Sequence, residues 1–339
     1  MIDFEKPMLE ESAHCDDPSQ PIPDVSVVIV SWNVAALLAD CLDSLVQTSE
    51  GIVLEVWVVD NASSDNTVEM LRTRYSWVHL IANEDNRGFA RANNQAIRQA
   101  RGRFALILNP DTIVRPGVIQ GLMRYLETHS DVGMVGPCLR DLKGDIDGSS
   151  ARRMYTMSVA ICLEMMRLHK LPWIGPVIQR RLYSPYDFAA TQEVEAISGA
   201  AMLVRRELLE KLQGFGDSFL HFGEDVDLCF RIRAAGWKLV FDASVTMIHI
   251  GGQSTKQTTG RMAVNGYFSN QEFFRRCYGR WHALLYRLIA QCICVPQLLV
   301  MGCIQYVLGR ESGHSFRNRL SLVWHLIRWQ ADAATSDEE

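Results

Sequence analysis

The sequence has 339 residues, of which 48% are hydrophobic and 22% are charged, and its formal net charge is −5. This composition is ordinary for a globular protein with a full core, and the length allows one large domain plus an accessory segment or two modest domains. An acidic balance argues against a nucleic-acid-binding protein, which usually has a basic surplus, so we expect no nucleic-acid partner.

The cysteines and the N-terminus indicate where the protein works. The nine cysteines are odd in number and include no C-x-x-C pair, which favours reduced, buried thiols over disulfides or a zinc site. Residues 1–24 are acidic, contain Pro18, Pro21 and Pro23 near their end, and lack the apolar segment of a signal peptide. We interpret them as a loose N-terminal leader and expect the active part of the protein to be cytoplasmic.

From residue 25 onward, short apolar runs alternate with helical patterns. The expected strands are Val25–Val30, Leu54–Val59, Val78–Ile81, Phe104–Leu108 and Val132–Val135. The expected helices are 35–47, 65–75, 88–100 and 116–128. Strands that alternate with helices in this way predict a parallel sheet with helices on both faces.

The pattern is less regular over residues 138–190, where paired arginines are separated by prolines. We interpret this segment as an insertion with one or two helices that acts as a lid or as an acceptor wall. After Glu195 the pattern becomes regular again. It predicts a helix from about Arg206, another over about 226–235, and a strand at 238–241.

Polar side chains follow four consecutive predicted strands. They belong to Ser31-Trp32-Asn33, Asp60-Asn61, Asn86-Arg87-Gly88 and Asn109-Pro110-Asp111. Each group has a structural alternative, because such residues also cap helices or form turns. In an open α/β sheet, however, ligands bind outside the carboxyl ends of the strands, and all four groups belong to that edge.

These residues suit a nucleotide with a diphosphate. The carboxylate of Asp60 can hydrogen-bond a nucleobase, and Arg87 offers a charge or a stacking surface. No glycine-rich phosphate loop follows the first strand, so the phosphates need another source of positive charge. A divalent cation held by carboxylate oxygen is a common solution, and Asp111 is the natural ligand.

A second group of candidates lies between residues 221 and 254. Glu224, Asp225 and Asp227 are three carboxylates within four residues, and crowding raises carboxylate pKa values toward those of a general base. The alternative is a solvated helix start, where acids are favourable. His249 ends an apolar run and precedes Gly-Gly-Gln-Ser, which would suit a metal-binding or phosphate-binding loop.

Seven ordered blocks resemble a known family. They read VSVVIVSWN, VVDNASSDNT, NEDNRGFARANNQA, ALILNPDT, ISGAAMLVRRE, FGEDVDLCFRIRAAGW and HIGGQS, and they span about residues 25–256. Together they resemble family 2 glycosyltransferases, which are inverting enzymes with a GT-A fold, and most of all the bacterial rhamnosyltransferase-type members. The resemblance implies an α/β fold with a mostly parallel central sheet, helices on both faces and a C-terminal helical segment. It places a glycosyltransferase domain at residues 25–260.

The resemblance also implies residue roles. The donor-binding residues would be Ser31, Asn33, Asp60, Asn61, Arg87, Gly88, Asn109 and Asp111. The ligands of Mg²⁺ or Mn²⁺ would be Asp111 and His249. Asp225 would be the catalytic base, with Glu224 beside it. The acceptor side would be lined by Ser198, Gly199 and Ala200. Asn109 departs from the D-x-D pattern of the family and cannot add negative charge, which predicts a modest metal affinity.

The implied activity is the inverting, metal-assisted transfer of a sugar, L-rhamnose from dTDP-rhamnose, to a hydroxyl of a cell-surface glycan or lipid-linked acceptor. A sugar nucleotidyltransferase is the alternative enzyme, although WNVAALL follows the first strand where that class needs a basic, glycine-rich loop. A non-catalytic protein that binds glycans or nucleotide sugars is the other alternative. The sequence leaves the oligomeric state open, with a homo-oligomer among the options.

The C-terminal region, 261–339, is predicted to be helical and to associate with the membrane. Residues 288–308 contain no charge, and residues 275–328 contain eight arginines and one acidic residue, a local net charge of +7. A cationic, apolar segment that contains tryptophans suits a helix pair on the surface of anionic lipid. A buried helical subdomain or dimer contact, and a true membrane span, are the alternatives. We therefore expect peripheral attachment to the inner face of the cytoplasmic membrane.

Overall fold

The computed structural model describes residues 21–48, 50–166, 170–173, 175–219, 223–251 and 261–308, and residues 320, 323–324 and 326–328. Most of the predicted leader therefore lies outside the described residues. The strands are β1 Val25–Ser31, β2 Leu54–Asp60, β3 His79–Ala82, β4 Phe104–Leu108, β5 Thr112–Ile113, β6 Val132–Arg140, β7 Ala151–Arg152, β8 Gln192–Val194, β9 Ala196–Ile197, β10 Ala201–Arg205 and β11 Lys238–His249. The helices are α1 Ala35–Thr48, α2 Thr67–Arg74, α3 Phe89–Ile97, α4 Val118–Thr128, α5 Met157–Val159, the π-helix η1 Ala160–Met165, α6 Gly175–Leu182, α7 Arg206–Lys211, α8 Glu224–Ala234, α9 Arg261–Tyr278 and α10 Arg280–Val307.

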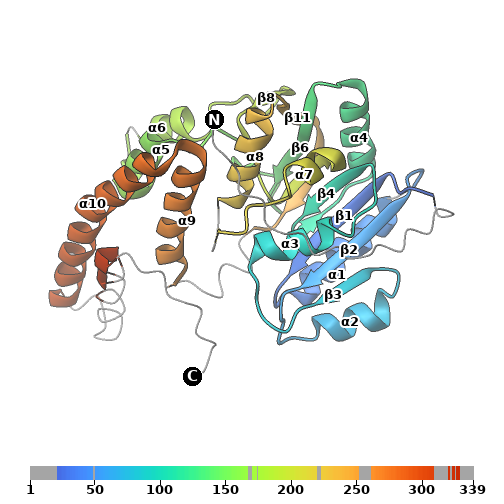
Figure 1. Cartoon of the computed structure of the whole chain (residues 1–339), viewed down its shortest axis with the longest axis horizontal. Helices are drawn as coiled ribbons and strands as arrows, with labels where there is room; N and C mark the ends of the chain where they lie inside the picture. The colour runs from blue at the N-terminus through green and yellow to red at the C-terminus, as the bar shows by residue number, and fades with distance from the viewer. Residues whose placement is uncertain are drawn as a thin grey trace.

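A nine-stranded mixed sheet forms the centre of the α/β part (Figure 1). Its order is β3-β2-β1-β4-β10-β6-β11-β5, with β8 paired to β11. The first four strands are parallel, as predicted, whereas β10 runs antiparallel between β4 and β6. The reason is topological. Ala201, the first residue of β10, pairs with Leu108, the last residue of β4. Strand β10 therefore begins at the edge of the sheet where β4 and β6 end, and it runs in the opposite direction to both.

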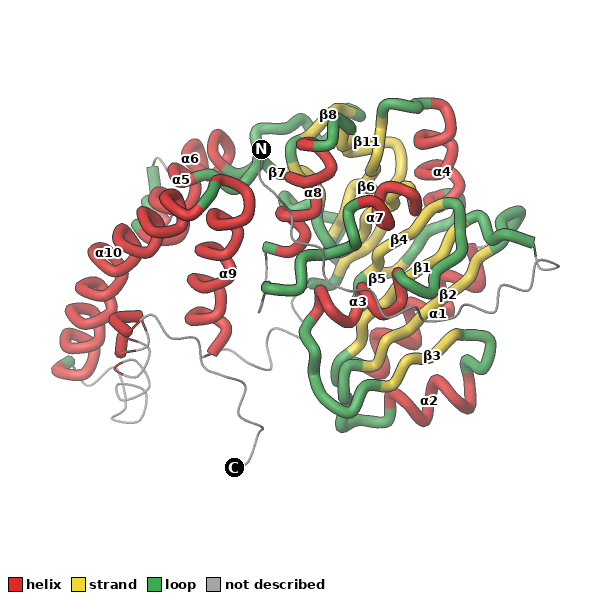
Figure 2. The backbone as a smooth tube through the Cα atoms, in the orientation of Figure 1, coloured by secondary structure: helices red, strands yellow, loops and turns green. Residues whose placement is uncertain are grey.

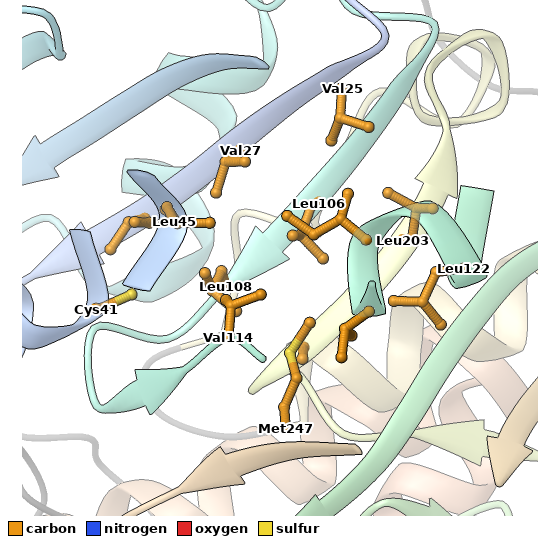
Figure 3. Close-up of a cluster of buried hydrophobic side chains, with 14 of the residues drawn as sticks. Val25, Val27, Cys41, Leu45, Leu106, Leu108, Val114, Leu122, Leu203 and Met247 are labelled. Atoms are coloured by element: carbon orange, nitrogen blue, oxygen red, sulfur yellow. The ribbon is translucent and has the colours of Figure 1, made fainter. Parts of the chain in front are cut away.

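The alternation of side chains along β1 explains why the sheet is covered on both faces. Val25, Val27 and Ile29 belong to one buried cluster, which packs under α1 and α4, and Val28 and Val30 belong to another, which packs under α3 and α8. Figure 3 shows the first cluster, where Leu45 of α1 and Leu122 of α4 surround residues of β1 and β4. The predicted two-sided fold is confirmed.

Element boundaries agree with the predictions to within a few residues in the first half of the chain. Helix α4 begins at Val118 rather than Pro116, because Gly117 before it has a φ of +79°, outside the helical region. Strand β6 runs to Arg140 rather than Val135, and α8 begins at Glu224 rather than Val226. Asp65 accepts a hydrogen bond from the Thr67 amide (3.1 Å) just before α2, but the residue at the N-cap is Asn66, whose side chain makes no capping hydrogen bond.

Helices α9 and α10 lie beside the α/β part, next to α5 and α6 (Figures 1 and 2). A third buried cluster joins these helices through Ala160 and Met165 of η1, Phe274 of α9, and Tyr286 and Ala290 of α10. By length and composition, α10 is the one candidate for a membrane span in the described part of the chain, and only 12% of its most apolar window is buried. We call η1, α9 and α10 the helical unit.

The cysteines are free at all eight positions that the structure describes. Cys41, Cys138, Cys229 and Cys294 are buried, as the sequence suggested. The expectation of burial is wrong for Cys292 and Cys303, which lie on exposed parts of α10.

Candidate active site

Strands β1 and β2 end side by side in two buried polar residues. Ser31 and Asp60 are in register, and 0% and 1% of their surfaces are exposed. Asp60 Oδ2 accepts a hydrogen bond from the Ser63 amide (3.0 Å), whereas Asp60 Oδ1 and Ser31 Oγ have no partner among the described residues. An unpaired buried polar atom costs about 1–3 kcal/mol, so both atoms are suited to hydrogen-bond a ligand at this edge.

The loops after these strands have unusual backbone conformations. Asn33 and Ala62 have φ values of +52° and +64°, which non-glycine residues seldom adopt. The two loops hold each other, since Asn33 Oδ1 accepts from the Ser64 amide (2.7 Å) and the Asn33 amide donates to Ser63 Oγ (2.9 Å). Such strain is typical of binding sites, where the surrounding structure maintains it.

Asn61 connects the second loop to the segment before α3. Its side-chain oxygen accepts a hydrogen bond from the Arg87 amide (3.0 Å), and its nitrogen donates to Asn86 Oδ1 (2.7 Å). Gly88 has a φ of +76° and donates its amide to the same Asn86 oxygen (3.0 Å). The structure therefore brings Asn61, Arg87 and Gly88 together, while the Arg87 guanidinium lies in an exposed position against Asp85 (3.2 Å).

The two predicted metal ligands face each other. β5 pairs with β11 so that His249 lies opposite Thr112, and His249 Nε2 is 3.6 Å from Asp111 Oδ1. His249 Nδ1 is 3.0 Å from Oδ2 of Asp147, a residue that the sequence analysis did not select. Burial opposes ionisation of Asp147, but hydrogen bonds from His249 and Ser149 lower its pKa to about 2.

This geometry fits a divalent cation. An ionised Asp147 only accepts hydrogen bonds, so Nδ1 of His249 bears a proton. Burial opposes protonation of His249, but Asp147 and Asp111 raise its pKa, so Nε2 releases its proton when it binds a cation. A carboxylate that orients a ligand histidine is a frequent feature of metal sites. Within the described ranges no three acidic, His or Cys side chains form a complete metal site. The Gly252 and Ser254 of the proposed loop lie outside those ranges.

The segment Ser198–Ala200 links the two halves of the site. The Asn109 amide donates to the Ala200 carbonyl (2.9 Å), and the Gly199 amide donates to Asp225 Oδ2 (3.2 Å). A Cβ at position 199 would lie 3.2 Å from that of Asp225, so a glycine permits this close approach. The predicted acceptor-side residues therefore lie between the Asn109–Asp111 turn and Asp225.

Asp225 is held at the start of α8 by a buried ion pair. Arg152 Nη2 lies 2.5 Å from Asp225 Oδ2, and the two side chains are 16% and 17% exposed. The charge of Asp225 raises the pKa of Arg152 above its usual range, although burial opposes this. Asp225 Oδ1 accepts only from the amide of Val226 (2.8 Å). Asp225 is thus fixed in orientation, with Oδ1 less encumbered than Oδ2.

Burial and the crowding of carboxylates act on Glu224, which begins α8. Burial, followed by the charge of Asp225, raises the pKa of Glu224 to about 8. Glu224 is 9% exposed, and its Oε2 has no partner among the described residues. The expectation that crowding would tune the base therefore applies to the neighbouring residue.

Two functional candidates beyond the predicted set come from a distant part of the chain. Asp147 and Arg152 belong to the segment that was interpreted as an irregular insertion, and they contact His249 and Asp225. Asp227, which the sequence analysis grouped with Glu224 and Asp225, is fully buried and accepts from Arg231 Nε (2.7 Å) and from Arg276 Nε of α9 (3.0 Å). In the sequence, only the charges of Asp147 and Arg152 within a short segment could have drawn attention to them. Their partners are distant, because His249 lies 102 residues after Asp147 and Asp225 lies 73 residues after Arg152.

The family model described as "Glycosyltransferase like family 2" matches residues 23–267. The chain is 30% identical over 280 residues to the N-acetylglucosaminyl-diphospho-decaprenol L-rhamnosyltransferase of Mycobacterium tuberculosis. The matched region covers 76% of this chain and 87% of that protein. It is 25% identical to the rhamnosyltransferase WbbL of Escherichia coli, over 58% of this chain and 67% of WbbL.

Two solved structures have the same fold. One is GalNAc-T7 with UDP, GalNAc and Mn²⁺ (TM-score 0.51, 17% identity, 67% of this chain and 44% of that one). The other is a mannosyltransferase of Pyrobaculum calidifontis in complex with GDP-Man and Mn²⁺ (TM-score 0.50, 19% identity, 92% and 86%).

The fold and the sequence blocks define a glycosyltransferase of the GT-A type. The chain belongs to glycosyltransferase family 2, and its relatives include rhamnosyltransferases. The predicted family and enzyme class are confirmed, and the alternatives of a nucleotidyltransferase and of a non-catalytic binding protein are not needed.

Proposed function

We propose that this enzyme transfers L-rhamnose from dTDP-rhamnose to a hydroxyl of a cell-surface glycan or lipid-linked acceptor, with inversion at the anomeric carbon. The observation that supports this most is the position of Asp225. It lies at the wall of a pocket, its orientation is fixed by Arg152 and Gly199, and Ser198–Ala200 connects it to the donor edge of the sheet. The rhamnosyltransferases among the relatives support the choice of sugar.

The donor nucleotide binds at the carboxyl ends of β1, β2 and β4. Asp60 Oδ1 accepts a hydrogen bond from the base, and Ser31 Oγ donates one to it or accepts one from it. Both atoms are buried and have no protein partner among the described residues. Asn33 and Asn61 hold the surrounding loops, Arg87 and Gly88 border the base, and Asn109 lies beside the ribose.

Asp111 and His249 would hold Mg²⁺ or Mn²⁺ beside the donor diphosphate. When bound, the cation neutralises charge on the departing nucleotide. The lone pair of His249 Nε2 and the carboxylate of Asp111 provide a mixed nitrogen and oxygen donor set, and the solved structures of this fold that contain Mn²⁺ support the proposal.

In the transfer, Asp225 accepts the proton of the acceptor hydroxyl. That oxygen forms a bond to the anomeric carbon as the bond from this carbon to the nucleotide oxygen breaks on the opposite face. A single displacement of this kind inverts the configuration. Glu224, whose pKa is raised, remains mainly protonated at neutral pH and limits the negative charge beside Asp225.

The enzyme works at the cytoplasmic face of the membrane, to which helix α10 attaches it peripherally. Trp281, Leu284, Leu285 and Leu288 are exposed on α10, and Arg280 and Arg287 lie among them. Aromatic, apolar and cationic side chains together suit the surface of an anionic bilayer. Extraction from membranes by alkaline carbonate would support attachment, whereas resistance to it would indicate a span.

Donor binding gives the first test. We expect dTDP-rhamnose with Mg²⁺ or Mn²⁺ to stabilise the protein by roughly 2.7 kcal/mol at about 100 times its Kd, and other sugar nucleotides to stabilise it less. Product analysis by NMR would then show an inverted anomeric configuration. Stabilisation by a different sugar nucleotide would replace rhamnose, and retention of configuration would contradict the single displacement.

A further inference from the structure

A pocket of about 410 Å³ opens beside Asp225 and has no role in the donor site. The catalytic helix α8 forms one wall, through Asp225. The other walls belong to η1, α6 and α9, which contribute Leu163, Gln179 and Phe273. Its volume lies in the range of ordinary small-molecule sites.

One side of the pocket suits a sugar. Gln179, Tyr183 and Asn270 bring amide and phenol groups to it, which can hydrogen-bond hydroxyls. Tyr155 and Phe273 add aromatic rings, 5.7 Å apart between centroids, whose faces suit the C–H groups of a pyranose. Because Asp225 lines the same pocket from the α8 wall, a hydroxyl of a sugar bound here can meet the base.

The other side of the pocket is apolar and continues into the helical unit. Leu163 lies on η1, whose Ala160 and Met165 belong to the buried cluster that contains Tyr286 of α10. Phe273 is followed in α9 by Phe274, which stacks on Tyr286 with ring centroids 5.2 Å apart. The same short helices therefore form the apolar wall of the pocket and the base on which α10 is mounted.

We infer that this pocket is the acceptor site and that its ligand is an amphiphilic glycoside, a sugar that bears an apolar aglycone. The sugar lies between Asp225 and the polar wall, and the aglycone lies along Val159 and Leu163 toward the helical unit. This inference rests on the proposed function, because it takes Asp225 as the base. It also moves the acceptor site from Ser198–Ala200 to a pocket whose walls, except for the start of α8, are formed by residues outside the family blocks.

Binding of methyl and hexyl glycosides to the full-length protein tests the inference without turnover. A panel of glucosides, galactosides and N-acetylglucosaminides below their micelle concentrations would be titrated by ligand-observed NMR in the presence of the nucleotide. At about 0.8 kcal/mol per buried CH₂, we expect at least one hexyl glycoside to bind about tenfold or more tightly than its methyl counterpart. Absence of any hexyl preference would overturn the inference.

Matched leucine variants locate the apolar contact. Leu163→Gln in the pocket should abolish the hexyl preference and leave methyl glycoside binding unchanged, whereas Leu285→Gln on the exposed face of α10 (47% exposed) should preserve it. Val159→Thr, which is nearly isosteric, provides a second pocket variant if Leu163→Gln does not fold. An equal loss in the pocket and surface variants would place the alkyl chain on α10 and overturn the inference.

The donor measurement in the same samples separates the two proposals. If the sugar nucleotide still stabilises the protein but no hexyl preference exists, only the acceptor inference fails. If the hexyl preference follows the pocket variants but no sugar nucleotide binds, the proposed donor chemistry fails and the pocket remains an amphiphile site.

Discussion

The donor and acceptor sides of this enzyme are built in different ways. On the proposed donor side, Ser31 and Asp60 are the last residues of two buried strands and Asn109 follows a third, and the register of the sheet brings them together. On the acceptor side, Asp225 meets Arg152 across 73 residues of sequence, and Asp227 meets Arg276 across 49. The donor side is thus a property of one sheet, whereas the acceptor side depends on contacts between separate segments.

This difference indicates that specificity for the acceptor can change more easily than specificity for the donor. A strand end is fixed by the core on both faces of the sheet, so the donor residues have little freedom to move. The acceptor pocket is formed by short helices and by α9, which pack on α8 and on α10. We therefore expect donor-side substitutions to act on binding of nucleotide and metal, and acceptor-side substitutions to act on turnover.

The largest expected effect tests the catalytic role on the acceptor side. Asp225→Asn should lower kcat by on the order of a hundredfold or more, because it removes the proton acceptor, and should leave the donor-induced thermal shift intact. Asp217→Asn is a suitable control, since that residue lies in the loop before α8 and contacts Asn94 and Arg91 rather than the pocket. Turnover close to that of the unmodified enzyme would remove Asp225 from the role of base.

The next effect tests whether Arg152 positions Asp225. Arg152→Met leaves a partly buried carboxylate without its counter-charge, and breaking a buried pair typically costs about 3–5 kcal/mol of stability. The double variant Arg152→Met, Asp225→Asn should regain most of that stability without regaining activity. Arg152→Lys should restore kcat in part with little change in donor Kd.

Denaturant unfolding and steady-state kinetics would be measured for the unmodified enzyme, the two single variants Arg152→Met and Asp225→Asn, and the double variant. Together these four proteins give the coupling between the two side chains. If Arg152→Met lowers stability while kcat is unchanged, the ion pair is structural only, and the acceptor side does not depend on it for turnover.

Much of the fold and of the donor site could be predicted from local sequence. The run VSVVIV alternates its side chains between two cores, and the polar residues after it can only lie at the edge of the sheet. Asp111 and His249 were likewise predicted, and the pairing of β5 with β11 brings them together.

The remainder depended on tertiary contacts. Asp147 and Arg152 lie in a segment without a hydrophobic period, and nothing in the residues around them specifies that they reach His249 and Asp225. The antiparallel entry of β10 was also not predictable from periodicity, because a buried strand has the same pattern in either direction. Glu224 has a raised pKa because its side chain is buried and Asp225 adds a negative charge beside it, and local sequence does not specify the burial.

A smaller effect probes the metal side through Asp147. Asp147→Ala should weaken metal-dependent donor binding by about 10–100-fold, because His249 loses the carboxylate that orients its ring. Asp147→Asn retains a hydrogen-bond acceptor and should lose less. Asp145→Asn, in the same loop but exposed, is the matched control. Titration of Mn²⁺ at saturating nucleotide, followed by the thermal shift, would measure the difference; equal metal affinity in all three variants would contradict the orienting role.

The smallest effect concerns the pH dependence of stability. Glu224 keeps its proton in the folded state up to about pH 8 but loses it near pH 4.5 when unfolded, so the folded state binds more protons between these values. The free energy of unfolding should therefore fall as pH rises, by up to about 1.4 kcal/mol per pH unit from this residue. Glu224→Gln removes the ionisation, so its unfolding free energy should fall less steeply between pH 5.5 and 7.5. Parallel slopes for the two proteins would show that Glu224 is already ionised at neutral pH, and the charge beside Asp225 would then be higher than the acceptor-side mechanism assumes.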